Sequence, residues 1–227
     1  MEKAESETGE KKTWFANITA PLLEMERRLE ILADYGVPHA MVDIVVLGWG
    51  GVLDYIRELA EDYGIALHAH RAMHAAFDRN PRHGLSMFVL AKLARVVGVD
   101  QIHIGTAGGA GKLEGSKWDV IQYKRVITEN HYVPEENDPF HMEQRFYHMK
   151  PVFPTSSGGL HPPGNIEPVI DALGKDIVLQ LGGGTMGGHP DGPKAGAMAA
   201  RQAIDAIMQG IPLDEYARSH RGAREGP

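Results

Sequence analysis

The chain contains no cysteine and no long hydrophobic run. Its 227 residues include no thiol, which excludes both a disulfide framework and a thiolate metal site. No segment reaches the roughly 18 apolar residues of a membrane span, and the charged start MEKAESETGEKK has no apolar core of a signal peptide. We therefore expect a cytoplasmic protein that does not insert into a membrane.

Positive charge is also scarce. Lysine and arginine number 23 against 30 aspartates and glutamates, a net charge of -7, and no basic run occurs. Because nucleic acids and anionic membranes attract clustered positive charge, we expect neither as a partner, and any bound anion should be small. The hydrophobic content of 43% over this length predicts one sizeable core and a single domain over residues 1–227.

Short apolar runs alternate with helical patterns along most of the chain. Each run precedes a segment with apolar residues at helical spacing, such as Leu53, Ile56 and Leu59. This alternation predicts right-handed βαβ units and a parallel sheet. The strand-like runs are 13–20, 40–48, 65–74, 101–106, 150–157 and 176–184. The proline-containing, charged segment 129–150 is predicted to be an insertion, and 211–227 a trailing helix turn and a tail.

Six βα units are too few for a closed TIM-type (β/α)8 barrel, which needs eight. Glycine, 27 of 227 residues, clusters where the predicted strands end. In barrels and doubly wound sheets the loops after the strands form the ligand site. The pattern therefore predicts an incomplete α/β barrel whose ligand-binding face carries the glycine loops.

The loop GTAGGAGKLEG (105–115) follows a predicted strand and carries one lysine, Lys112. It is not a P-loop, because leucine follows the lysine where Ser or Thr would hold magnesium. Glycines around a single lysine favour a lid that brings a cation over bound substrate. The alternative is a surface loop with a solvated lysine.

Two further loops, SSGGLHPPG (156–164) and GGGTMGGHPDG (182–192), place consecutive glycines between a strand and a helix. Backbone N–H groups in such positions can surround a phosphate. Either loop alone could be a tight turn; the two together favour a phosphate site.

The stretch GIALHAHRAMH (64–74) allows two functional interpretations. His68 and His70 lie on the same side of a strand and could form a His-x-His metal pair. Such a site needs further His and Asp ligands at strand ends, and the chain offers His103 but no convincing aspartate after the last strand. Alternatively, Arg71 clamps a phosphate, with His70 and His103 as hydrogen-bonding and proton-transfer partners. His68 and His74 are then hydrogen-bonded core residues.

The order of these motifs closely resembles the RuBisCO large subunit. HAHRAMHAAFDRN, HIGTAGGAGKLEG, SSGGLH and LGGGTMGGHPDG follow one another on successive strands, while TGEKKTWFANITA and AMVDIVVLGWGGV resemble the family's third and fourth barrel strands. The resemblance extends from about Thr8 to about Met208 and is nearest the archaeal, form III type. It implies barrel strands three to eight.

The resemblance also implies roles for particular residues. His70 would lie near the C3 oxygen and the metal, and the lid residue Lys112 would stabilise the new carboxylate. The residues implied to bind ribulose 1,5-bisphosphate are Arg71 and His103 at the C5 phosphate, Ser157 at a hydroxyl, and Gly159, Gly182 and Gly183 at the other phosphate.

The sequence departs from the family in its metal ligands. The family holds Mg2+ with a carbamylated lysine, an aspartate and a glutamate on the second strand, and nothing before Thr13 supplies them. The glycine loop before Lys112 is longer than usual, and GGGTMGGHP carries an extra glycine. Because the enediolate must be stabilised by Mg2+ while CO2 attacks, we expect negligible carboxylase activity from the isolated chain.

Three hypotheses follow for the function. The first is a large-subunit fragment whose family adds CO2 or O2 to ribulose bisphosphate, the former giving 3-phosphoglycerate. The second is a RuBisCO-like sugar-phosphate enolase or isomerase, which the intact HRAMH and GKLEG motifs disfavour. The third is a non-catalytic phosphate-binding or assembly module. The expected partner is a second copy of the chain or a complementing amino-terminal chain.

Overall fold

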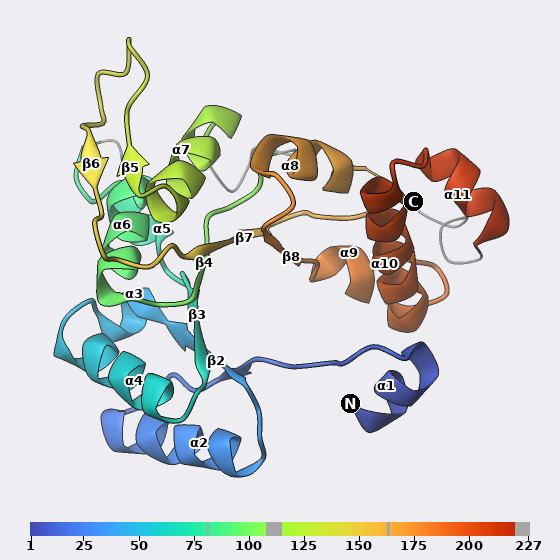
Figure 1. The fold of residues 1–227 in the computed structure, drawn as a ribbon, viewed down its shortest axis with the longest axis horizontal. Coiled ribbons are helices and arrows are strands. Elements are labelled where there is room, and N and C mark those ends of the chain that lie inside the picture. Colours follow the sequence, from blue (N-terminus) through green and yellow to red (C-terminus); the bar gives the residue numbers. More distant parts are fainter. Residues whose placement is uncertain (81, 108–114, 163, 221–227) are drawn as a thin grey trace. The chain divides into compact units, whose positions relative to one another are not determined.

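The computed structural model describes residues 1–80, 82–107, 115–162 and 164–220. Its main sheet has six strands in the order β1-β2-β3-β4-β7-β8, at Ala16–Asn17, His39–Asp43, Ala66–His70, Gln101–His103, Phe153–Ser157 and Val178–Gln180. The pairings of β1 with β2, β2 with β3, β3 with β4, and β7 with β8 are all parallel. The structure confirms the predicted parallel α/β sheet, which has six of the eight strands of a TIM-type barrel (Figure 1).

Helices connect the strands, as the apolar spacing predicts. In α4 the apolar stripe buries Leu53, Ile56 and Ala60, and α4 lies beside α2 (Figure 1). The helices are α1 Glu2–Thr8, α2 Leu22–Asp34, α3 Ile44–Leu47, α4 Gly51–Asp62, α5 Ala75–Asp78, α6 Met87–Val97, α7 Lys117–Thr128, α8 Ile166–Leu173, α9 Gly183–Met186, α10 Pro193–Gln209 and α11 Leu213–Ser219. None of those within the described ranges is long and apolar enough to cross a membrane.

The chain forms two compact units. The first comprises Met1–Ile102 with Val126–Val152, and the second comprises His103–Arg125 with Phe153–Pro227. In the second unit, α8 and α10 bury Ile166, Ile170 and Ala203 in a shared apolar cluster. A single domain over the whole chain therefore stays a prediction.

The predicted strand 40–48 is wrong after Asp43. Residues Ile44–Leu47 form the short helix α3 instead. The backbone N–H of Asp43 donates to Thr19 Oγ1 at 2.8 Å, and Gly48, with φ 79°, ends the helical turn by donating to Ile44 O at 3.0 Å. The β-branched run favoured a strand, but these two bonds, one of them to a distant segment, turn the chain at the strand end.

The predicted insertion 129–150 contains a small antiparallel pair, β5 (His131–Tyr132) and β6 (Gln144–Arg145). Arg95 of α6 fastens this segment within the first unit. Its side chain is 1% exposed and makes five hydrogen bonds, to the carbonyls of Val126, Glu129, Met149 and Lys150 and to the side chain of Asn130. A guanidinium carries five N–H donors, so one side chain can cap the end of α7 and hold the insertion together.

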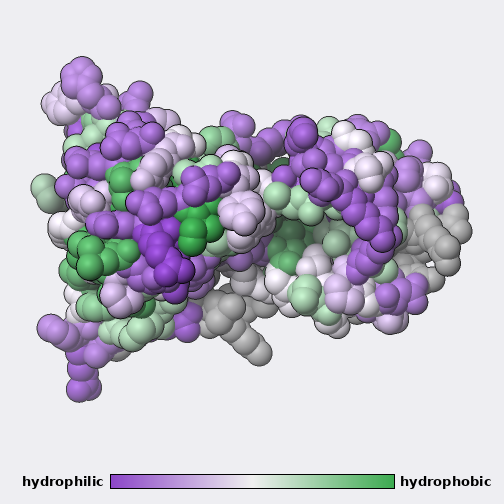
Figure 2. Space-filling model, turned by 90° about the horizontal axis from the view of Figure 1, so that it is seen from below, coloured by the Kyte–Doolittle hydropathy of each residue, from purple (hydrophilic) through white to green (hydrophobic). Residues whose placement is uncertain are grey.

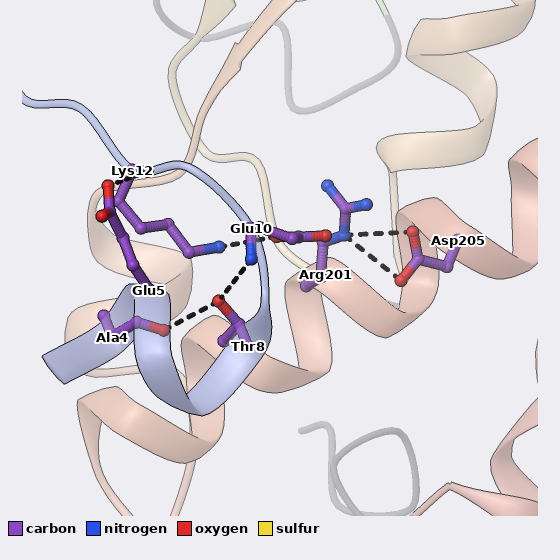
Figure 3. A network of polar contacts seen from close by, with 7 residues as sticks. All are labelled: Ala4, Glu5, Thr8, Glu10, Lys12, Arg201 and Asp205. Carbon is purple, nitrogen blue, oxygen red and sulfur yellow. Dashed lines mark hydrogen bonds and ion pairs between the residues drawn. The ribbon is translucent and has the colours of Figure 1, made fainter. Parts of the chain in front are cut away.

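Both units also carry local polar networks at the surface, where hydrophilic and hydrophobic side chains are interspersed (Figure 2). Figure 3 shows Thr8 donating to Ala4 O at 2.8 Å and Lys12 paired with Glu10 at 2.6 Å. The backbone N–H of Lys12 also donates to Glu5, and this bond lowers the pKa of the Glu5 carboxyl. On α10, Arg201 pairs with Asp205 one turn away (Figure 3). Exposed pairs of this kind contribute little to stability.

Candidate active site

In the first unit, polar side chains meet at the carboxyl ends of three neighbouring strands. His70 ends β3 and Asp43 ends β2, and the two residues are opposite each other in the strand register. His70 Nδ1 lies 2.5 Å from Asp43 Oδ1, and Asn17, at the end of β1, donates its Nδ2 to Asp43 Oδ2 at 3.1 Å. A carboxylate oxygen accepts hydrogen bonds, so this contact is one in which His70 Nδ1 donates to Asp43.

Arg71 follows directly after β3, and its side chain is buried, with 5% exposed. The chain turns sharply here: His74 N–H donates to Arg71 O at 3.0 Å, and Met73 adopts φ 68°. A left-handed conformation costs a non-glycine residue about 1–2 kcal/mol, so the turn beside the predicted phosphate clamp is strained. Such outliers cluster at functional sites.

His68 and His74 are hydrogen-bonded histidines, as predicted. His68 is 2% exposed, contacts Gln101 Oε1 through Nδ1 at 2.8 Å, and stacks on Phe15. Burial lowers the pKa of His68 below its ordinary value. His74 contacts the Asp78 carboxylate at 2.6 Å. These contacts give both residues structural roles.

In the second unit, the structure brings together two predicted substrate-binding residues, His103 and Ser157. His103 Nδ1 lies 2.8 Å from Ser157 Oγ, and His103 is 4% exposed. The Thr106 hydroxyl lies 2.6 Å from Ser157 O and 2.8 Å from Gly158 O. Because Gly158 and Gly159 have φ values of 105° and 71°, the turn after β7 needs glycine at both positions.

The glycines of the two predicted phosphate loops differ in what surrounds them. A Cβ added at Gly159, Gly182 or Gly183 would meet nothing within 4 Å, whereas one at Gly184 would overlap the carbonyl oxygen of Leu160. Packing therefore explains the glycine at position 184, and the positive φ explains Gly159. Neither explains Gly182 and Gly183, and open space beside their backbone is what a bound anion would require.

Asn165 fixes the shape of the first of these loops. It is 7% exposed and donates its Nδ2 to Gly159 O at 2.8 Å. Its Oδ1 accepts the N–H of His161 at 3.0 Å. The carbonyl of Gly159 and the backbone of His161 are thus both held by one buried side chain.

Sequence reasoning missed four of these polar residues: Asn17, Asp43, Thr106 and Asn165. In the structure, Asn17 and Asp43 end β1 and β2, whereas Thr106 and Asn165 lie in the segments that follow β4 and β7. Ligand sites of α/β folds form at strand ends, but the sequence placed Asn17 and Asp43 inside longer predicted strands, so this signal needed the correct strand bounds. The predicted lid residue Lys112 lies outside the described residues.

The described residues do not fit the magnesium ion that the resemblance implies. No group of three or more His, Asp or Glu side chains placed to hold a metal occurs among them. The His-x-His metal reading of His68 and His70 therefore lacks the further ligands it needs, and His68 is committed to Gln101.

Parallel βα units with polar groups and glycine loops at the strand ends define a TIM-type α/β-barrel protein, here with six of the eight strands. Residues 1–225 match the family described as ribulose bisphosphate carboxylase large chain, catalytic domain. The chain belongs to this family.

Individual relatives agree with that assignment. The ribulose bisphosphate carboxylase of Thermococcus kodakarensis is 73% identical over 221 residues, which cover 97% of this chain and 49% of that protein. The crystal structure of an archaeal RuBisCO matches with a TM-score of 0.89 at 70% identity, covering 98% of this chain and 50% of that one. A dimeric archaeal RuBisCO from Hyperthermus butylicus matches with a TM-score of 0.88 at 52% identity, covering the same shares. The chain thus spans about half the length of the relatives it matches.

Proposed function

We propose that this chain is the substrate-clamping portion of a ribulose 1,5-bisphosphate carboxylase/oxygenase. In this proposal it acts in the cytoplasm with a chain portion that supplies the metal ligands, and the assembly adds CO2 or O2 to the sugar bisphosphate. The observation that carries the proposal is the 73% identity to an archaeal carboxylase over 97% of the chain.

The arrangement of each unit supports a role in binding a sugar bisphosphate. Arg71 offers a buried, permanently charged guanidinium, whose planar donors match phosphate oxygens. His103 and Ser157 form a joined polar pair, and Gly159, Gly182 and Gly183 have open space beside their backbone. We assign Arg71 and His103 to the C5 phosphate, Ser157 to a sugar hydroxyl, and the glycines to the other phosphate. Lys112 is assigned to the new carboxylate.

The metal-binding part of the reaction requires a partner. Within the described ranges no metal cluster exists, so Mg2+ would need ligands from the portion of the relatives that this chain does not match. A complementing amino-terminal chain would supply these ligands. Several copies of the complex between that chain and this one could then assemble into a larger oligomer. The relative from Hyperthermus butylicus is dimeric, which supports association of copies.

Complementation tests the proposal directly. The 227-residue chain is co-expressed with the amino-terminal portion of the Thermococcus kodakarensis relative, and incorporation of labelled CO2 into 3-phosphoglycerate is measured. We expect no incorporation by the chain alone and incorporation by the purified complex. A stable complex that fixes no CO2, or fixation by the chain alone, would contradict the proposal.

Two arginine variants test the phosphate clamp. Arg71→Ala should weaken ribulose bisphosphate binding to the complex by about tenfold or more, because a hydrogen bond to a charged group contributes about 1.5–3 kcal/mol. Arg27→Ala is the matched control, since Arg27 is 69% exposed on α2 and should leave affinity unchanged. Equal affinities of the two variants in calorimetric titration would refute the assignment of Arg71.

A further inference from the structure

Asp43 is the centre of a hydrogen-bond network that joins the ends of three strands. Its Oδ1 contacts His70 Nδ1 at 2.5 Å, and its Oδ2 accepts Asn17 Nδ2 at 3.1 Å. Its backbone N–H donates to Thr19 Oγ1 at 2.8 Å, and Thr19 N–H donates to Asn17 Oδ1 at 3.0 Å. Hydrogen bonds therefore hold Asp43 at both carboxylate oxygens and at its backbone N–H.

This network also fixes the direction of each donor. Thr19 N–H must donate, so Asn17 presents Oδ1 to Thr19 and its amide N–H groups to Asp43. Asp43 then accepts on both oxygens. A carboxylate that accepts from His70 keeps the imidazole proton on Nδ1 and sets the plane of the ring.

We propose that Asp43 is the positioning residue of His70: it holds the imidazole in the Nδ1–H tautomer, so that Nε2 is the proton-accepting atom. The assignment of His70 to sugar-phosphate chemistry rests on the proposed function. When Nε2 takes a proton from a substrate hydroxyl, the O–H bond breaks, its electron pair stays on oxygen, and a new N–H bond forms. The resulting imidazolium keeps its Nδ1–H bond to the Asp43 carboxylate, which stabilises the positive charge.

The exposed fractions of the two side chains suit a histidine that meets substrate and a carboxylate that lies behind it. The His70 side chain is 35% exposed and that of Asp43 is 17% exposed, so the carboxylate is screened from water more than the ring. His74 and Asp78 make a similar contact at 2.6 Å, but one turn apart along the chain and with 15% and 9% of their side chains exposed. That pair provides an internal control for any measurement on His70.

The variant Asp43→Asn gives a sharp expectation. An asparagine must accept from Asn17, whose N–H groups are turned toward it, and therefore presents its own amide N–H to His70. The ring nitrogen Nδ1 then becomes the acceptor, and the proton moves to Nε2. The variant loses the hydrogen bond from Nδ1–H to a charged carboxylate and gains one from a neutral amide N–H to Nδ1. The ratio of the Nδ1–H to the Nε2–H tautomer of His70 should therefore fall by at least about tenfold.

The test is nitrogen NMR of the full 227-residue chain with 15N-labelled histidine, in which ring shifts report the tautomer. The His70 signals are assigned by their loss in His70→Gln. We expect the Nδ1–H form of His70 in the wild type and the Nε2–H form in Asp43→Asn, with His74 unchanged. Asp78→Asn should alter His74 and leave His70 as it was.

A wild-type His70 in the Nε2–H form would overturn the proposal without any variant, as would an unchanged tautomer in folded Asp43→Asn. In the complemented enzyme, Asp43→Asn should lower kcat by roughly a hundredfold, the size of a general acid–base contribution, with KM nearly unchanged. An unaltered kcat would count against a positioning role. The tautomer is read without substrate, so failure of CO2 fixation in the wild-type complex would refute the proposed function while leaving the Asp43 result intact.

Discussion

Replacing Arg95 is predicted to loosen the first unit, because this one side chain holds together segments far apart in the sequence. The guanidinium donates to Glu129 O at 2.6 Å and to Val126 O at 3.0 Å, and its other three bonds are between 3.2 and 3.4 Å. It also lies 4.0 Å from the centroid of the Phe146 ring. Burial lowers the pKa of Arg95, but an arginine stays charged.

The magnitude follows from the two short bonds. In Arg95→Met, the two buried carbonyls of Val126 and Glu129 lose their hydrogen-bond donor, and each loss lowers the free energy of unfolding by about 1–3 kcal/mol. The lost cation–π contact lowers it by about 1 kcal/mol more. Removing a charge from a buried position returns part of this cost, which leaves a loss of about 3 kcal/mol. Arg95→Lys should also be destabilising, by about 2 kcal/mol, since one ammonium cannot reach carbonyls spread along a guanidinium fork.

Urea unfolding followed by far-UV circular dichroism measures the loss, and hydrogen exchange locates it. We expect faster exchange in 126–152, the segment that Arg95 fastens, because local opening depends on local contacts. Arg27→Met is the control: its ion pair to Glu24 is 4.0 Å long and exposed, so it should cost less than about 0.5 kcal/mol. If Arg95→Met and Arg95→Lys both unfold within 1 kcal/mol of the wild type (about a fivefold change in the equilibrium constant), the reasoning is refuted.

Two further predictions concern pH and glycine packing. Because burial lowers the pKa of His68 below 6.5, the unfolded chain binds a proton as the pH falls through that value while the folded chain does not. Stability should therefore fall below pH 6.5 by up to about 1.4 kcal/mol per pH unit from this group, and urea midpoints at pH 7.5 and 5.5 should differ less in His68→Gln than in the wild type. Gly196→Ala should destabilise by about 1–3 kcal/mol, because the added Cβ would overlap Thr185 O; Gly51→Ala, with nothing within 4 Å, should be neutral or gain up to about 1 kcal/mol. Equal thermal midpoints for the two alanine variants would show that close packing does not explain Gly196.

The strands and the helices that follow them were predictable because their signal is periodic and local. Apolar spacing identified the buried face of α4, and each of the six runs of apolar residues overlaps a strand of the main sheet. The predicted strand bounds were less accurate: the run 40–48 ends as a strand at Asp43 because a side chain of another segment, Thr19, takes its backbone N–H. A bond between residues so far apart leaves no periodic trace in the sequence.

The site was predictable to the extent that its motifs are contiguous. One short stretch was enough to name Arg71 and His70 as candidates, and the structure places His103 beside Ser157, a contact that the sequence did not predict. The roles of these residues stay predictions. Asp43 was missed because the sequence placed it inside the predicted strand 40–48 and not at a strand end, and its contacts with β1 and β3 arise only in the folded chain. The glycines are easy to find in the sequence, but the sequence does not show what surrounds each one. Gly183 and Gly184 are neighbours, yet a Cβ added at Gly183 would meet open space and one added at Gly184 would meet a backbone oxygen.

Each unit orients its own polar groups with contacts that involve no ligand. In the first, Asn17 and Thr19 hold Asp43 against His70; in the second, Thr106 lies against the turn that carries Ser157. Preorganised dipoles and donors do not have to reorganise when charge develops, and ordering side chains on binding would otherwise reduce affinity. In the proposed enzyme, a partner would therefore contribute metal ligands, whereas Asp43, His70 and Ser157 are already oriented by contacts within their own units.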